Sequence, residues 1–241
     1  MVTVADDEPA GAPRWLWIVV LAAAAALVAL GLIGVVLAMA GVYHTWIALP
    51  AAAVATAAAV PTISRLTDYE PAASTSGRRW AIVAAVVIVV LGGWSAGRLG
   101  HHVVTTHDPG VYANTALWIA EDGSLRAPAG GTADGPLVAA VLAEFDDAQV
   151  ISPGAYVGGD DELEFQFSHA PSVVMAAASD LAGRRGLFVT PVLVGMLALG
   201  AVYLLATRFV RSHGLALAAT ATLGLSIPWL YVTRSTYSEP F

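Results

Sequence analysis

The sequence contains no cysteine and no lysine, and it is poor in charge. All 11 basic residues are arginine, and charged residues make up 12% of the 241 positions, compared with about a quarter in soluble globular domains. Without cysteine there is no disulfide, no thiolate metal site and no cysteine nucleophile. The net charge of -7 is opposite in sign to that of nucleic-acid-binding domains, so we exclude a nucleic-acid partner.

Long apolar runs dominate what remains. Apolar residues make up 57% of the chain and its mean hydropathy is +0.71. A membrane span needs about 20 predominantly apolar residues to cross roughly 30 Å of hydrocarbon. Five windows meet this requirement: residues 15–40, 46–63, 80–99, 187–210 and 215–232. The pattern predicts an all-α polytopic membrane protein with about five transmembrane helices in a lipid bilayer.

Two of these windows need comment. The second is the weakest, because Pro50 and Pro61 interrupt it. The first is far longer than the apolar region of a signal peptide, and the residues before it include Asp6, Asp7 and Glu8. We therefore interpret the first window as a retained span.

The arginines orient the spans, because cytoplasmic loops carry an excess of basic residues near span ends. The connections between the second and third windows and between the fourth and fifth are short and basic, whereas the turn at 41–44 has no arginine. The pattern predicts a multi-pass protein of the plasma membrane with a cytoplasmic N-terminus. Arg184 and Arg185, on the opposite side, argue against this orientation.

In this orientation residues 101–185 form one large extracytoplasmic loop. The loop holds 12 acidic residues and 3 arginines, a formal charge of -9. Loops longer than about 15 residues are usually functional or disordered. The alternation at 162–167 predicts a strand, hairpinned with 149–157, and residues 172–181 favour a short helix leading into the fourth span.

A further short helix is predicted over 109–120, at the start of this loop. Asp108 is a preferred capping residue, Pro109 suits a first helical position, and Gly123 suits a helix end. The apolar residues of this segment fall on one face, so the helix is expected to lie along the membrane surface.

Three short segments carry a resemblance to a known family. They are His-Asp-Pro-Gly-Val-Tyr-Ala at 107–113, Phe-Gln-Phe-Ser-His-Ala-Pro at 165–171 and Arg-Ser-Thr-Tyr-Ser-Glu-Pro at 234–240. In their order and their placement between spans they resemble membrane-embedded glycosyltransferases of the GT-C type, which include protein mannosyltransferases and bacterial aminoarabinose transferases. More narrowly, they look like segments of actinobacterial members. No single segment is as diagnostic as a P-loop.

The resemblance covers residues 80–241 and divides the chain. Residues 1–79 would be a tail with two additional spans. The start of the shared core would comprise the span 80–99, the outer loop 101–185, the spans 187–210 and 215–232, and the beginning of a second outer loop at 233–241. Because a motif-like segment stands directly after the fifth window, we expect an N-terminal part of a longer polytopic protein that is inactive alone.

The resemblance also implies a reaction and a set of residues. The reaction is inverting transfer of a hexosyl or pentosyl group from a polyprenyl-phosphate-linked sugar to an acceptor glycan, lipid or protein. The implied catalytic residues are Asp108, which would deprotonate the acceptor, and Glu239, which would position a metal or the acceptor. The implied substrate-binding residues are Arg234 at the lipid phosphate, His169 beside the donor cavity, Tyr112 and Tyr237. No cofactor is implied with certainty, and a divalent cation is left open.

Each of these interpretations has a plain structural alternative. Asp108 would serve as an ordinary helix cap worth about 1 kcal/mol, Glu239 as a solvated loop carboxylate, and Arg234 as a snorkelling residue at a span end. His169 would bond to backbone. His101, His102 and His107 stand before Asp108, but their spacing fits no strong zinc pattern.

Two other functions also remain open. A transporter or flippase of a lipid-linked or envelope precursor would carry ionisable residues within its spans, and these five windows contain essentially none apart from terminal arginines. A non-catalytic membrane scaffold would use the acidic loop to bind partners.

Overall fold

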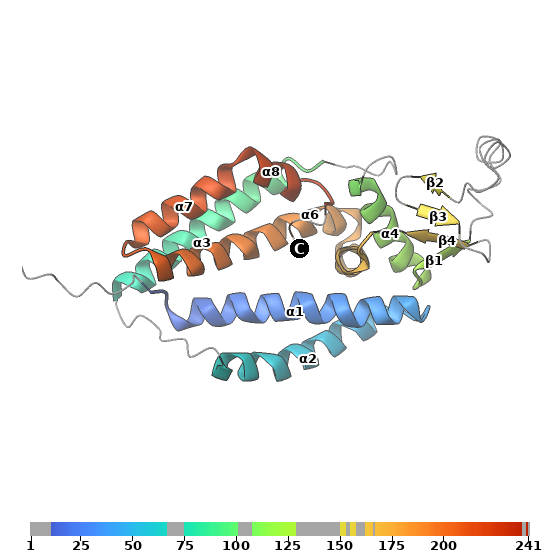
Figure 1. The fold of residues 1–241 in the computed structure, drawn as a ribbon, viewed down its shortest axis with the longest axis horizontal. Helices are drawn as coiled ribbons and strands as arrows, with labels where there is room; N and C mark the ends of the chain where they lie inside the picture. The colour runs from blue at the N-terminus through green and yellow to red at the C-terminus, as the bar shows by residue number, and fades with distance from the viewer. Residues whose placement is uncertain are drawn as a thin grey trace, which may run out of the picture.

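The structure is a computed structural model that describes residues 11–66, 75–100, 108–128, 150–152, 155–157, 162–165, 167–237 and 240. Most of this part of the chain is helical (Figure 1). The helices are α1 (Arg14–Met39), α2 (Thr45–Leu66), α3 (Thr75–Ala96), α4 (Asp108–Asp122), α6 (His169–Phe209), α7 (His213–Leu225) and α8 (Ile227–Thr233). The strands are β1 (Arg126–Pro128), β2 (Val150–Ser152), β3 (Ala155–Val157) and β4 (Glu162–Phe165).

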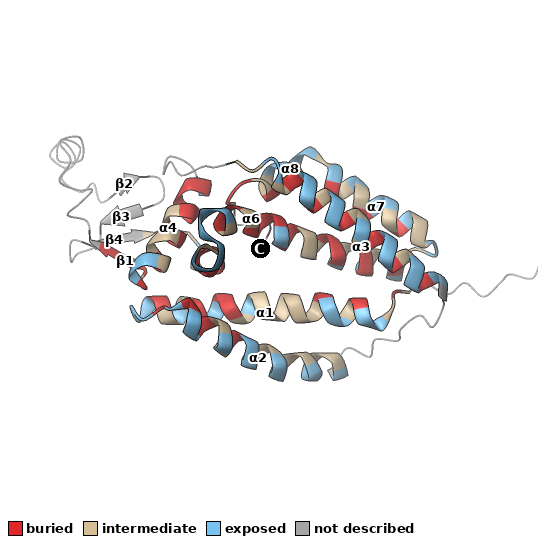
Figure 2. Ribbon diagram, turned by 180° about the vertical axis from the view of Figure 1, so that it is seen from behind, coloured by how far each residue is buried: buried red, intermediate tan, exposed pale blue. Residues whose placement is uncertain are grey.

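Among the described residues, four helices, α1, α2, α3 and α6, are long and apolar enough to cross a membrane, and α7 with α8 makes a fifth if that bent pair is one span. These helices are compatible with the predicted multi-pass membrane protein. Exposed positions run along these helices (Figure 2). Large apolar side chains such as Leu32, Trp46 and Val90 are among the exposed residues. Helix α2 continues through Pro50 and Pro61, so the weakest predicted span is one unbroken helix.

Helix α6 is two helices joined at a kink. Ala182 and Gly183 have non-helical backbone angles, and Gly183 has a φ of +62°, a conformation that glycine adopts without the steric cost of a Cβ atom. The segment before the kink is seen nearly end-on in Figure 1, whereas the segment after it runs lengthwise. The short helix predicted at 172–181 is therefore present. It begins earlier, at His169, and is continuous with the fourth span except at this kink.

The fifth predicted span is bent rather than straight. Helices α7 and α8 meet at an angle of 62°. Between them, the Ser226 side chain accepts a hydrogen bond of 3.4 Å from the Trp229 amide and caps α8. Pro228 occupies the first turn of α8, where its missing N–H costs no hydrogen bond. A local Ser-x-Pro start signal thus divides an apolar run that hydropathy treats as one segment.

The helices form two layers with α6 between them. Helix α1 packs against α2 and against α6, and α6 packs in turn against α3, α4 and α7. Figure 1 shows α4 and the strands together at one end of the bundle. This arrangement places the segment that follows α3 and the segment that follows α8 near the start of α4.

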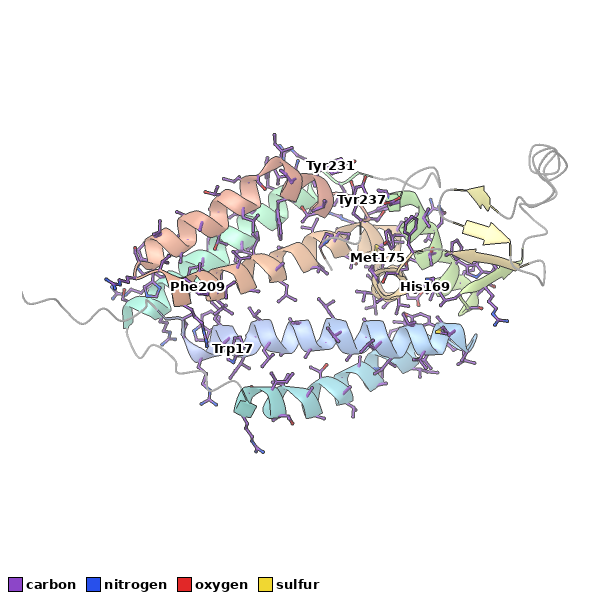
Figure 3. The ribbon with its side chains drawn as sticks, viewed as in Figure 1. Trp17, His169, Met175, Phe209, Tyr231 and Tyr237 are labelled. Atoms are coloured by element: carbon purple, nitrogen blue, oxygen red, sulfur yellow. The ribbon has the colours of Figure 1, made fainter. Side chains whose placement is uncertain are left out.

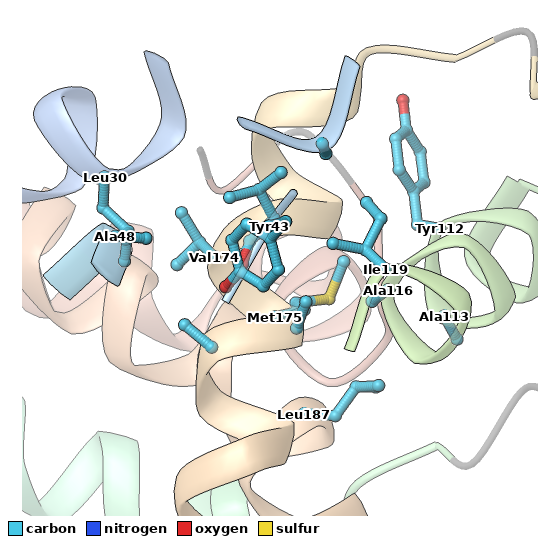
Figure 4. Packing of buried hydrophobic residues seen from close by; sticks show 14 of the residues in the cluster. Leu30, Tyr43, Ala48, Tyr112, Ala113, Ala116, Ile119, Val174, Met175 and Leu187 are labelled. Carbon is cyan, nitrogen blue, oxygen red and sulfur yellow. The ribbon is translucent and has the colours of Figure 1, made fainter. Parts of the chain in front are cut away.

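Helix α4 is buried along the face predicted from its sequence. Tyr112, Ala116 and Ile119 are all buried. They join an apolar cluster that includes Tyr43 from the α1–α2 turn and Met175 from α6 (Figure 4). The first two helices and the segments of the predicted core therefore share one hydrophobic cluster.

Hydrogen bonds also fix the α1–α2 turn to the end of α4. The Tyr43 amide donates to the Gly123 carbonyl at 2.9 Å, and the Leu125 amide donates to the Ala38 carbonyl at 3.1 Å. The Thr45 hydroxyl donates to a carboxylate oxygen of Asp180 on α6 at 2.6 Å and lies 3.1 Å from the Tyr43 hydroxyl. Burial raises the pKa of Tyr43, and the nearby Asp180 charge acts in the same direction.

The described strands form one antiparallel sheet in the order β1-β4-β3-β2. Strand β4 pairs with β3, with Ala155 opposite Phe165, so the predicted hairpin is present between 155–157 and 162–165. Residues 150–152 form a separate strand, β2, which pairs with β3 rather than with β4. Position 149 itself, the connecting turn and Gln166 lie outside the described residues. Strand β1 was not predicted; it follows α4 directly and pairs with β4.

Two glycines with nearly equal φ angles allow a matched test of the contact between α4 and the α1–α2 turn. Gly41 has a φ of +69° and open space around it, whereas a Cβ atom on Gly123, at +71°, would lie 2.7 Å from the Tyr43 carbonyl oxygen. We expect Gly41→Ala to cost about 1–2 kcal/mol from backbone strain alone. Gly123→Ala should cost more, roughly 3 kcal/mol, because the turn must also move.

The measurement is the apparent melting temperature of each variant in detergent. Equal losses for the two variants would show that the contact between α4 and Tyr43 does not hold the structure together.

Candidate functional site

The candidate site lies where the residues after α8 meet the end of α3 and the beginning of α4. The Gly100 amide donates to the Arg234 carbonyl at 2.7 Å. The Thr236 hydroxyl donates to the carbonyl of Pro109. Ser235 and Thr236 are buried. Two loops that are more than 120 residues apart in sequence are thereby fixed at one end of the bundle.

Two arginines stack on one indole ring at this position. The guanidinium carbon of Arg234 lies 4.4 Å from the centroid of the Trp94 ring, and that of Arg98 lies 5.1 Å from the same centroid. Arg98 also donates to the Trp94 carbonyl at 3.3 Å. Desolvation, followed by the charge of Arg98, lowers the pKa of Arg234. Stacking on an indole face stabilises a cation, yet here it gathers two like charges.

The Arg234 guanidinium has donors without acceptors. Its Nε and Nη2 atoms are buried and have no hydrogen-bond partner within the described part of the chain. These two atoms form one edge of the guanidinium, and such an edge matches the oxygens of a phosphate or carboxylate. Buried donors left unpaired cost about 1–3 kcal/mol. The arrangement is thus suited to binding an anion.

Asp108 is the first residue of α4 and is exposed. A carboxylate is favoured at this position by the helix dipole. Its carboxylate makes no hydrogen bond to any residue that the structure describes, so it caps no amide there. An exposed carboxylate that no described residue engages is available to a ligand.

Tyr237 lies beside the site. Its hydroxyl is 2.9 Å from the hydroxyl of Tyr231, and the two rings are 5.4 Å apart (Figure 3). The pair leaves polar groups on the surface at the end of α8, where Tyr231 is 60% exposed. Aromatic faces with exposed hydroxyls are suited to sugar rings.

Two other predicted site residues lie elsewhere. Tyr112 is 5% exposed, packs against the Phe167 ring at 5.4 Å, and accepts a hydrogen bond from Ser172 through its carbonyl. His169 is half-buried at the start of α6, apart from Tyr231 and Tyr237 in Figure 3. Burial lowers the pKa of His169, which favours the neutral imidazole. Their predicted roles in substrate binding remain predictions.

An apolar cavity of about 190 Å³ lies next to His169, between α1 and the beginning of α6. Its lining consists of Leu27, Val28, Gly31, Leu32, Ala170, Pro171 and Val174. The cavity contains no charged side chain, so it is suited to hydrocarbon.

The other predicted acid and the predicted histidine cluster are not part of the described structure. Glu239 and the histidines at 101, 102 and 107 lie outside the described residues. Within the described ranges, no group of three His, Cys, Asp or Glu side chains is placed to hold a metal ion. The structure therefore brings together the segments that carry Asp108, Arg234 and Tyr237.

Sequence reasoning did not identify Trp94 and Arg98. The two residues are four positions apart at the end of a predicted span, and tryptophan and arginine at span ends are common interface anchors. The spacing places both on one face of a helix, but only the structure shows Arg234 on the same ring.

Comparisons of the chain with protein-family models, with curated proteins and with solved structures found no match.

The hydroxyl of Thr236 offers a test of how the site is held together. In Thr236→Val the Pro109 carbonyl loses its donor, and a buried hydrogen bond of this kind is worth about 1 kcal/mol. We expect the backbone amides at 234–237 to exchange with solvent about fivefold faster.

The measurement is hydrogen exchange followed by mass spectrometry on the protein in detergent. Thr222→Val, on the exposed face of α7, is the control and should leave the exchange at 234–237 unchanged. Identical exchange in wild type and Thr236→Val would show that this hydrogen bond does not hold residues 234–237 in place.

Proposed function

We propose that this protein is a membrane glycosyltransferase that moves a sugar from a polyprenyl-phosphate-linked donor to an acceptor at the outer face of the plasma membrane. The observation that carries the proposal is that a hydrogen bond joins two segments at one end of a bundle of apolar helices, one with a carboxylate and one with a guanidinium edge that have no partner among the described residues. Asp108 supplies the carboxylate and Arg234 the guanidinium, and the hydrogen bond from Thr236 to Pro109 links their segments.

Such a reaction needs a base at the acceptor and a cation at the leaving group. Asp108 would take the proton of the acceptor hydroxyl as the acceptor oxygen bonds to the anomeric carbon. The bond between that carbon and the phosphate oxygen breaks, and its electron pair stays on the phosphate. Arg234 would hold the phosphate, since its guanidinium edge matches phosphate oxygens.

The surroundings support a lipid donor. The site lies at one end of helices that are long and apolar enough to cross a membrane, so a lipid chain anchored in the bilayer would leave its phosphate near the helix ends. The proposed orientation, with the N-terminus in the cytoplasm, places this end outside the cell. Glu239, in the segment after Tyr237, is the proposed second acid.

Asp108→Asn tests the base directly. The substitution preserves size and removes proton affinity, so we expect transfer to fall by about 100-fold or more. Glu121→Gln, an exposed position at the far end of the same helix, is the matched control and should retain transfer.

The measurement is sugar transfer in membranes that contain the wild-type or the variant protein. Each rate is divided by the amount of protein, which is determined by immunodetection. Full transfer by Asp108→Asn would overturn the assignment of the base.

A further inference from the structure

The arginine pair, Arg98 and Arg234, concentrates positive charge that has no counter-charge in the described part of the chain. Both guanidinium groups lie over the Trp94 ring, and no carboxylate among the described residues pairs with either. Two guanidiniums over one ring repel each other, and the charge of Arg98 contributes to the lowered pKa of Arg234. A fold that tolerates this repulsion would be stabilised by an anion that contacts both groups.

The two arginines differ in what they offer. Arg234 presents the unpaired Nε and Nη2 edge, which is shielded from solvent. Arg98 is exposed, and its hydrogen bond to the Trp94 carbonyl uses a single Nη1 donor. An anion that contacts both groups would therefore meet an exposed guanidinium at Arg98 and a buried guanidinium edge at Arg234.

We infer that the arginine pair on Trp94 binds a lipid phosphate monoester in preference to a lipid phosphodiester. This inference rests on the proposed function. The donor of a sugar transfer is a phosphodiester with one negative charge. When the bond to the anomeric carbon breaks, the electron pair remains on the phosphate, and the released lipid is a monoester with a charge of about -1.5 to -2.

The number of cations follows from this change in charge. Arg234 alone would balance the single charge of the donor. Arg98 supplies a second positive charge, which gains its full interaction only as the second negative charge develops. A group that binds the departing phosphate more strongly than the bound donor accelerates bond breaking rather than donor binding. Arg98 is thus a residue for the leaving group.

The helix end provides a plain alternative for Arg98. Its bond to the Trp94 carbonyl is the kind that arginine makes near a helix C-terminus, and the helix dipole favours a cation there. That role requires one charge and is indifferent to which lipid is present. A comparison of two lipids in the same variant separates the alternatives.

The experiment measures apparent affinities by thermal stabilisation of the purified protein in detergent. The probes are undecaprenyl phosphate as the monoester, phosphatidylglycerol as the diester, and inorganic phosphate. Wild type should bind the monoester at least about tenfold more tightly than the diester, which corresponds to about 1.4 kcal/mol. Arg98→Gln should reduce that ratio to near one, mainly by weakening monoester binding.

Two variants serve as controls. Arg185→Gln removes an exposed arginine just after the α6 kink and should retain the preference. Arg98→Lys keeps the positive charge and should retain part of the preference for the monoester. Because each ratio compares two lipids on the same variant, a general loss of stability in Arg98→Gln cannot produce the expected result. An unchanged ratio in Arg98→Gln would overturn the inference, and so would equally tight binding of inorganic phosphate and the lipid monoester.

The two experiments distinguish a failure of this inference from a failure of the proposed function. If Arg98→Gln loses the monoester preference while Asp108→Asn retains full sugar transfer, the phosphate site stands and the assigned base falls. If Asp108→Asn abolishes transfer while Arg98→Gln keeps the preference, the transferase proposal stands and the role of Arg98 falls.

Discussion

The backbone conformation at Gly183 allows α6 to belong to both layers of the fold. Its φ of +62° turns the chain between two helical segments. The segment before it crosses α1 and packs on α4, and the segment after it runs beside α3 and α7. An unbroken helix of 41 residues would be about 60 Å long, roughly twice the hydrocarbon thickness. The break lets one helix span and still cover α4.

The crossing of α1 by α6 requires glycine as well. A Cβ atom on Gly34 would lie 2.1 Å from a Val173 side-chain carbon, and one on Gly31 would lie 3.2 Å from the Ala170 Cβ. Small residues let helices approach closely where a bilayer provides little hydrophobic driving force between them. The close approach buries Val173 and Met175. Because these two residues belong to the cluster that α4 packs against, the approach also determines where α4 lies. The position of Asp108 thus depends on glycines in the first helix.

The parts of this fold that sequence predicts are those encoded locally. Apolar runs indicated the long helices, and Asp108 with Pro109 indicated the start of α4. Hydropathy did not reveal the bend at Ser226, because the residues on both sides of it are apolar. The stacking of Arg234 on Trp94 was beyond prediction for a different reason: each residue alone fits an ordinary span end, and only the return of the chain after α8 brings them together. The link between Thr45 and Asp180 depends on the fold in the same way.

The charged groups of the site are positioned by neutral hydrogen bonds. The bonds from Gly100 to the Arg234 carbonyl and from Thr236 to the Pro109 carbonyl use backbone groups and a hydroxyl. They bring the segments of Asp108 and Arg234 together and consume neither the carboxylate nor the guanidinium. A direct ion pair would hold the same segments, but it would satisfy both charges within the protein. Because the positioning is neutral, both the carboxylate and the guanidinium remain available to interact with ligands.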